Sequence, residues 1–146
     1  MIGFDLSEVH LSLQELVRQF VSRDVLPDVG RNDSEGRFDR SLLPRMAKLG
    51  LLGLCIPSRH GGFDFDYISL GLACEELEYG DTSLRVILSV HLALHGLTLL
   101  SWGSEEQKER WLKPQARGEK IATFGLTEPD AGSDVVGLRT TARRDG

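Results

Sequence analysis

Apolar residues recur three and four positions apart through much of the chain, which predicts a mainly α-helical fold. The first such stretch is marked by these residues: Val9, Leu13, Leu16, Val17 and Phe20. Asp5 and Glu8 have the spacing of a capping box, so we expect this helix to begin beside Asp5 and to run as far as Pro27. The polar residues 28–38 then predict a loop.

Two further amphipathic stretches follow, and each ends at a glycine. Residues 42–49 predict a short helix closed by Gly50, because glycine readily adopts the left-handed conformation found at helix C-termini. Residues 67–79 predict a longer helix closed by Gly80, with acidic side chains on its polar side. Each helix should therefore bury one face.

Residues 82–101 are apolar almost all round, so we expect a central helix that the others surround. At 1.5 Å per residue its length is about 30 Å, which is also long enough to cross a bilayer. Arg85, His91 and His95 lie within it, and amphipathic helices flank it in the sequence. We therefore favour a buried helix over a membrane span.

A last helix, the fifth of the set, is predicted over residues 105–113. Ser104 precedes it and Gln107 follows three positions later, which is the spacing of a second capping box. Trp111 and Leu112 supply an apolar anchor on one of its faces.

The pattern then changes from helical to extended. Residues 121–127 form an apolar run with β-branched and aromatic members, and residues 138–143 indicate a second short strand. Two strands with open edges are marginal by themselves, so we expect a fragment. Its helical domain would cover residues 1–118, and the beginning of a truncated β domain would cover residues 119–146.

Composition is that of a globular domain and excludes some classes of function. A chain of 146 residues with 40% hydrophobic and 27% charged residues can bury one core of ordinary size. The net charge of -5 argues against nucleic-acid binding, since only Arg139, Arg143 and Arg144 approach a basic cluster. Residues 1–5 resemble neither a secretory signal nor an Arg-rich transit peptide, so we expect a cytoplasmic protein.

The cysteines and two of the histidines give no clear metal site. Cys55 and Cys74 lie far apart in apolar surroundings, without a CxxC motif, and are expected to be buried reduced thiols. His91 and His95 would share one face of a helix, but no Glu follows His91 as in zinc hydrolases. We therefore predict no metal ligands.

One segment indicates a function: residues 125–137 (GLTEPDAGSDVVG), called the glycine loop below. Gly132 and Gly137 let backbone amides approach a ligand, and Thr127 and Ser133 add hydroxyls, so the loop can hold a phosphorylated cofactor. An ordinary Gly/Asp turn is the alternative. For anion binding, the acidic side chains must point away or cap neighbouring backbone: Glu128, Asp130 and Asp134.

The glycine loop also resembles the signature of the acyl-CoA dehydrogenase family. That signature is small, aliphatic, Thr, Glu, two variable, small, Gly, Ser, Asp, two variable, small, and every specified position is filled. Asp130 occupies a position where Gly is common in the family. Further segments resemble the family in the same order: residues 49–53 with 56–57 and 61–62, residues 75–81, and residues 103–108.

The resemblance implies an FAD-dependent oxidation of the α,β bond of an acyl-CoA thioester, by proton abstraction and hydride transfer to flavin N5. Such enzymes have an N-terminal helical domain, a middle β domain and a C-terminal four-helix domain around FAD, usually as tetramers. The usual electron acceptor is an electron-transfer flavoprotein. The catalytic Glu of most members belongs to the C-terminal part, so no catalytic residue is assigned in this chain.

Motif positions imply the cofactor-binding residues. The resemblance places the flavin against Phe124, Leu126 and Thr127, and the FAD pyrophosphate against Gly132 and Ser133. Ser133 would also lie near the acyl-CoA substrate. Many members have Tyr where this chain has Phe124, so a phenolic contact is absent.

Arg85 is a candidate substrate-binding residue. Glu78 and Arg85 stand seven apart, and residues 81–85 (DTSLR) resemble the glutaryl-CoA dehydrogenase branch, where an Arg binds the distal carboxylate of the substrate. A guanidinium group suits a carboxylate, but Val86 replaces the Ser of that branch. A helix salt bridge between Glu78 and Arg85 is the alternative.

Two other functions stay open. An acyl-CoA oxidase or a flavin monooxygenase could use the same scaffold, with oxygen as the acceptor of electrons from the reduced flavin. Alternatively, the chain is a non-catalytic helical module that binds a partner protein and no cofactor.

Overall fold

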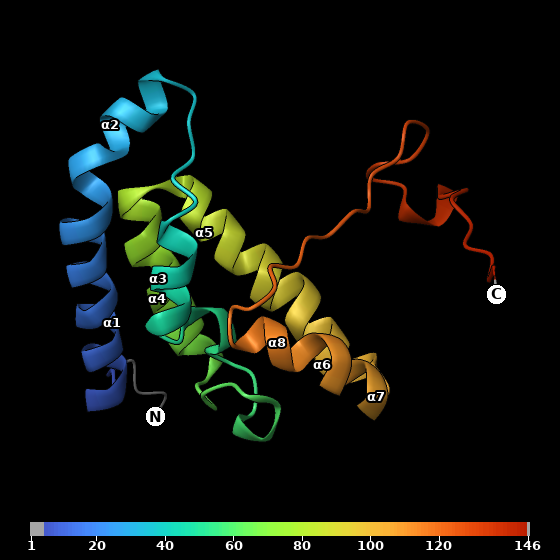
Figure 1. The fold of residues 1–146 in the computed structure, drawn as a ribbon, viewed down its shortest axis with the longest axis horizontal. Coiled ribbons are helices and arrows are strands. Elements are labelled where there is room, and N and C mark those ends of the chain that lie inside the picture. Colours follow the sequence, from blue (N-terminus) through green and yellow to red (C-terminus); the bar gives the residue numbers. More distant parts are fainter. Residues whose placement is uncertain (1–4, 146) are drawn as a thin grey trace.

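The computed structural model describes residues 5–145, and the regular structure in this part is helical (Figure 1). The mainly helical fold class is therefore confirmed. The elements, in order, are α1 (Glu8–Phe20), η1 (Val21–Val25), α2 (Leu26–Ser34), α3 (Leu42–Lys48), η2 (Leu51–Gly53), η3 (Ser58–His60), α4 (Tyr67–Gly80), α5 (Thr82–Leu88), η4 (Ser89–Gly96), α6 (Leu97–Trp102), α7 (Glu105–Gln107), η5 (Lys108–Leu112), α8 (Lys113–Ala116) and η6 (Val135–Gly137).

The start of α1 differs from the sequence prediction. The capping residue is Ser7, not Asp5: the Ser7 hydroxyl accepts from the His10 amide at 3.3 Å, and the Ser7 amide donates to His10 Nδ1 at 3.3 Å. A histidine thus takes the role that Glu or Gln has in the usual capping box. His10 Nε2 also lies 2.9 Å from Asp66, which caps α4, so the starts of α1 and α4 are joined.

The predicted end of the first helix at Pro27 was wrong, and so was part of the predicted loop over 28–38. Helical structure continues through η1, which is a π-helical turn, into α2 and ends at Ser34. Pro27 lies in the first turn of α2. The π turn changes the hydrogen-bonding register of the helix, and backbone amides in the first turn of a helix have no acceptor within it. The missing N–H of Pro27 therefore removes no helical hydrogen bond.

The other predicted helices are confirmed. Gly50 follows α3 with φ 77°, the left-handed conformation expected of a closing glycine. α4 begins at Tyr67 and ends at Gly80. Ser104 and Gln107 form the second capping box, and the helix that they start continues as α7, η5 and α8 as far as Ala116.

The core lies where α1, α3, α4 and the long helix Thr82–Trp102 meet. Its fully buried members include Val17, Met46, Leu77, Leu84 and Leu88. An ion pair also joins two of these helices: Arg18 of α1 donates to both carboxylate oxygens of the buried Glu76 of α4, at 2.7 and 3.1 Å. Such a bidentate pair fixes the rotation of α4 against α1.

The long helix, α5 with η4 and α6, is only partly surrounded, which corrects the sequence prediction. Leu84, Leu88 and Leu92 are buried along one side, whereas Leu94 is 46% exposed and Trp102 86% exposed. By length and composition Thr82–Trp102 could cross a membrane, but core helices of water-soluble proteins meet the same test. Its buried leucines pack in the helical core.

The predicted strands over 121–127 and 138–143 were wrong for the described residues. Both segments are irregular, and the glycine loop contains one isolated β-bridge, between Glu128 and Ala131. In Figure 1 this part of the chain leaves α8 and extends away from the helices. A strand needs a neighbour to pair with, and the described residues offer these segments none.

Truncating a buried leucine of the long helix should destabilise the fold far more than truncating an exposed one. We expect Leu88→Ala to lower the free energy of unfolding by about 2–5 kcal/mol, because Leu88 is fully buried and a cavity would remain. Leu94→Ala is the matched control on the same helix, and at 46% exposure it should cost less than about 1 kcal/mol. Urea unfolding measures both; equal losses would contradict this packing.

Candidate functional site

The glycine loop begins with a tight turn. The amide of Glu128 donates to the Ala131 carbonyl at 3.0 Å, and the Ala131 amide donates back to the Glu128 carbonyl at 3.1 Å. Pro129 and Asp130 therefore occupy the two corner positions, where a fixed proline φ and a short polar side chain are both favourable. The turn gives the loop a defined shape without a surrounding sheet.

Glu128 joins the start of the glycine loop to the two residues Arg139 and Thr140, which follow the loop. Its carboxylate accepts hydrogen bonds from the Arg139 amide at 2.6 Å, from the Thr140 amide at 3.0 Å and from the Thr140 hydroxyl. The Thr140 hydroxyl, followed by the Arg139 amide, holds the pKa of Glu128 below its usual range. This charge caps neighbouring backbone, which is one of the two arrangements that an anion-binding loop requires.

The other two acidic side chains of the loop also have local contacts. Asp130 lies 3.7 Å from the Arg139 guanidinium, in an exposed ion pair. Asp134 lies over Gly137, where a Cβ would come within 2.8 Å of a carboxylate oxygen. Gly137 thus leaves room for the Asp134 carboxylate, whereas the close ligand approach that the sequence suggested for Gly137 stays a prediction.

The part of the loop predicted to face a cofactor is open. Thr127, Gly132 and Ser133 are exposed, and among residues 5–145 neither hydroxyl has a hydrogen-bond partner and the Gly132 amide has no acceptor. A Cβ at Gly132 would meet only the Thr127 methyl, at 3.8 Å. These three residues therefore combine unpaired donors with an unobstructed backbone, which suits the phosphate groups of a dinucleotide.

Phe124 and Leu126 are not gathered with these three residues around one cavity. Phe124 lies against the long helix and lines a cavity of about 260 Å³ with Leu94, His95 and Trp102. Leu126 is 42% exposed. Their contact with a flavin stays a prediction.

Sequence reasoning missed the part that His91 plays. His91 is buried; its Nδ1 lies 3.0 Å from the Ala122 amide nitrogen, and its Nε2 lies 3.2 Å from the Gln115 carbonyl. His95 contacts the Gln115 side chain instead, at 3.0 Å. In the described part of the chain no group of three or more His, Cys, Asp or Glu side chains could hold a metal ion. Nothing in the helical spacing of the two histidines pointed to a backbone amide as their partner.

The two cysteines are separate free thiols. Both are half-buried, and burial raises the pKa of the Cys55 thiol to about 11 and raises that of Cys74 as well. Thiols with raised pKa values are protonated at neutral pH and are therefore weak nucleophiles.

Glu78 and Arg85 form the helix salt bridge that the sequence left as an alternative. Arg85 Nε donates to Glu78 at 2.6 Å, and Thr82 donates to the other Glu78 oxygen at 3.0 Å, so that the pKa of Glu78 is lowered. In residues 5–145 the two terminal nitrogens of the Arg85 guanidinium have no acceptor. The pair therefore leaves one side of the guanidinium able to bind a second carboxylate.

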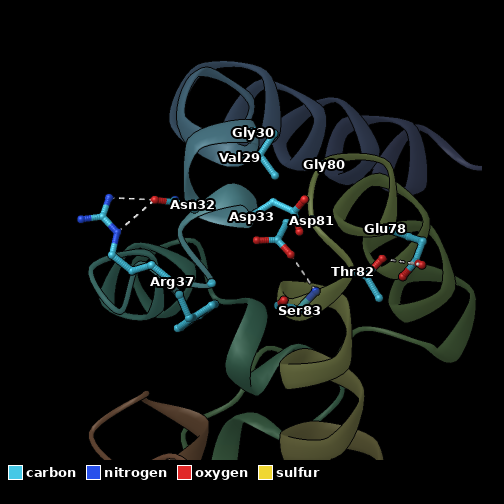
Figure 2. Close-up of a pocket in the computed structure, with 12 residues that line it drawn as sticks. Val29, Gly30, Asn32, Asp33, Arg37, Glu78, Gly80, Asp81, Thr82 and Ser83 are labelled. Atoms are coloured by element: carbon cyan, nitrogen blue, oxygen red, sulfur yellow. Dashed lines mark hydrogen bonds between the residues drawn. The ribbon is translucent and has the colours of Figure 1, made fainter.

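A cavity lies beside this pair, between α2 and the junction of α4 and α5 (Figure 2). Its volume is about 640 Å³, and Glu78, Thr82 and the α5 cap Asp81 line one side. On the opposite side Arg37 donates two hydrogen bonds to Asn32, at 2.7 and 3.2 Å. The polar groups in Figure 2 are thus mostly paired with one another.

Comparison with known sequences relates this chain to acyl-CoA dehydrogenases. Residues 7–119 match the family model described as acyl-CoA dehydrogenase, N-terminal domain. The short-chain specific acyl-CoA dehydrogenase, mitochondrial, of Bos taurus is 37% identical over 142 residues, which are 97% of this chain and 34% of that protein. The chain therefore spans about a third of the length of this curated relative.

Solved structures give the same result. One chain in the structure described as electron transferring flavoprotein of Acidaminococcus fermentans has a TM-score of 0.95 at 34% identity; the match covers 99% of this chain and 38% of that one. A glutaryl-CoA dehydrogenase from Mycobacterium smegmatis, in complex with FADH2, has a TM-score of 0.89 at 40% identity, with coverage of 97% and 36%.

Replacing Glu128 should open the glycine loop without melting the helices. In Glu128→Gln we expect faster hydrogen exchange at the Arg139 and Thr140 amides, because the charged acceptor is lost. In the unchanged chain, the pKa of Glu128 is lower in the folded state than the usual glutamate pKa of about 4.3. The hydrogen bonds from Arg139 and Thr140 to the Glu128 carboxylate should therefore be fully formed above that pH and be lost as the pH falls through the lower folded pKa. Amide exchange followed by NMR across this range measures both effects.

Asp130→Asn is the control, since it removes a charge from the same loop but only a 3.7 Å surface pair. Equal exchange at Arg139 and Thr140 in the two variants would show that Glu128 does not close the loop.

Proposed function

The chain belongs to the acyl-CoA dehydrogenase family, and from that premise we propose that it forms the flavin-facing N-terminal part of an FAD-dependent acyl-CoA dehydrogenase. The observation that carries this proposal is the glycine loop: a closed turn whose hydroxyls and Gly132 amide are unpaired in residues 5–145. A relative solved with FADH2, a glutaryl-CoA dehydrogenase, supports FAD as the cofactor.

The residues of the loop fit FAD in distinct ways. FAD supplies the hydride acceptor when it is bound. Thr127 would offer its hydroxyl and amide to the polar edge of the flavin, where hydrogen bonds stabilise the electron-rich reduced ring. Gly132 and Ser133 would bind the pyrophosphate through backbone amides and one hydroxyl. Glu128 takes no part in these contacts, because its carboxylate is occupied by Arg139 and Thr140.

The substrate and acceptor follow from the same proposal. The substrate would be an acyl-CoA thioester, with Ser133 near it, and the acceptor would be an electron-transfer flavoprotein. A chain from a structure described by the name of such a flavoprotein matches this fold at a TM-score of 0.95, which supports that acceptor. The complete enzyme would be a homotetramer. No residue of this chain is assigned as the base that removes the α proton.

A dicarboxylyl-CoA is a second candidate substrate, and the Arg85 geometry favours it. The side chain is held by Glu78 through Nε alone, so the terminal nitrogens can receive a substrate carboxylate. Glutaryl-CoA dehydrogenases are among the similar structures, one of them a complex with glutaryl-CoA.

The FAD proposal predicts the effect of two hydroxyl deletions. We expect the 146-residue chain to bind FAD saturably, and Thr127→Val and Ser133→Ala each to weaken binding by about tenfold, through the loss of one hydrogen bond. Ser34→Ala is the matched control, because that hydroxyl bonds to the Arg31 carbonyl within α2. Flavin fluorescence titration gives the affinities. A folded chain that does not bind, or that loses no affinity in either variant, would refute the proposed cofactor loop.

The dicarboxylyl proposal predicts a selective defect. In an active enzyme that contains this chain, Arg85→Gln should lower kcat/KM for glutaryl-CoA by about tenfold or more, because a buried carboxylate would lose its charged partner. Valeryl-CoA, of equal length without the distal carboxylate, should be turned over as before. Equal effects on the two substrates would show that Arg85 does not bind the distal carboxylate and only forms the salt bridge with Glu78.

A further inference from the structure

We infer that His91 is a positioning residue that fixes where the chain leaves the helices on its way to the glycine loop. The inference rests on the proposed function of that loop as the FAD mount. His91 lies in η4, a π-helical turn of the long helix, and contacts segments far away in sequence: Gln115 of α8 and Ala122 of the linker to the loop. π turns within α-helices are frequent at functional sites.

The hydrogen-bond donors settle which ring nitrogen of His91 carries the proton. A backbone amide can only donate, so Nδ1 must accept from Ala122, at 3.0 Å. Nε2 therefore carries the hydrogen and donates to the Gln115 carbonyl, at 3.2 Å. Burial lowers the pKa of His91 and keeps the ring neutral, which this arrangement requires. A protonated ring would place a second N–H against the Ala122 amide.

Ala122 is the last buried residue before the loop. Residues 123–127 are all exposed. Among the described residues, the bond from Ala122 to His91 is the one hydrogen bond that residues 121–127 make to the helices. Through a segment this short, an extended chain reaches at most about 17 Å, so the position of Ala122 limits where Thr127 can lie.

The neighbouring contacts strengthen the anchor. Gln115 is held twice, by His91 at its carbonyl and by His95 at its side chain. Both histidines come from the same π turn, so α8 and the linker are fixed to one short piece of the long helix. The burial of Gln115 and Ala122 keeps water from competing for these bonds.

Two substitutions separate the two hydrogen bonds of His91. His91→Asn places an amide oxygen near the position of Nδ1, keeps an acceptor for Ala122 and gives up the bond to Gln115. His91→Gln reaches toward the position of Nε2, keeps a donor for Gln115 and gives up the acceptor for Ala122. Each variant loses one buried bond, so a merely structural role predicts similar losses of stability and of FAD affinity in both.

The experiment uses the 146-residue chain and has a readout without cofactor and a readout with it. By NMR, we expect the ring ¹⁵N shifts of unchanged His91 to report an unprotonated Nδ1. In His91→Gln, the Ala122 amide should exchange faster and the amide resonances of residues 123–127 should shift, whereas His91→Asn should keep both close to the unchanged chain. FAD titration should then give about tenfold weaker binding in His91→Gln than in His91→Asn.

Three results would overturn the inference: a protonated Nδ1, equal effects of the two variants on residues 122–127, or equal FAD affinity despite a freed Ala122 amide. Failure of the cofactor proposal can be distinguished from failure of the inference about His91. If the unchanged chain binds no FAD, the cofactor proposal has failed, and the NMR comparison of the two variants alone decides whether His91 positions the loop.

Discussion

The buried side of the helix Thr82–Trp102 is the constraint on which the rest of the structure depends. Leu84, Leu88 and Leu92 on that side carry the contacts to the core. The same helix holds α8 and the linker through His91 and His95. Because one helix makes all these contacts, the position of the linker toward the glycine loop is fixed relative to the helical core.

The same helix also has an exposed part. Leu94 and Trp102 are exposed there, and Phe124 lies against the helix beside them. In the proposed enzyme, this face and the glycine loop would together border the flavin, so the helix would separate a core that gives stability from a surface that binds the cofactor.

The glycine loop shows how an acidic segment can still suit a phosphorylated ligand. Glu128 is turned onto the amides of Arg139 and Thr140, and Asp134 covers Gly137. These contacts give the loop its shape in the absence of a sheet. The donors left over at Thr127, Gly132 and Ser133 are those that a pyrophosphate and a flavin edge would use. Local hydrogen bonding thus engages the Glu128 carboxylate, and the ion pair with Arg139 engages Asp130.

Sequence by itself determined the elements whose causes are local. Helical periodicity, the Ser104 capping box and the left-handed Gly50 each depend on residues within one or two turns, and each prediction was confirmed. The signature of the glycine loop likewise identified the family from consecutive residues. Tertiary structure decided what depends on distant partners. The Ser7 cap, whose partner His10 also contacts the α4 cap Asp66, displaced the expected Asp5 cap, a π turn carried the first helix past Pro27, and the expected strands found no neighbours among residues 5–145. The tether between His91 and Ala122 joins residues 31 positions apart, and no spacing rule relates them, because their contact exists only once the helices have packed.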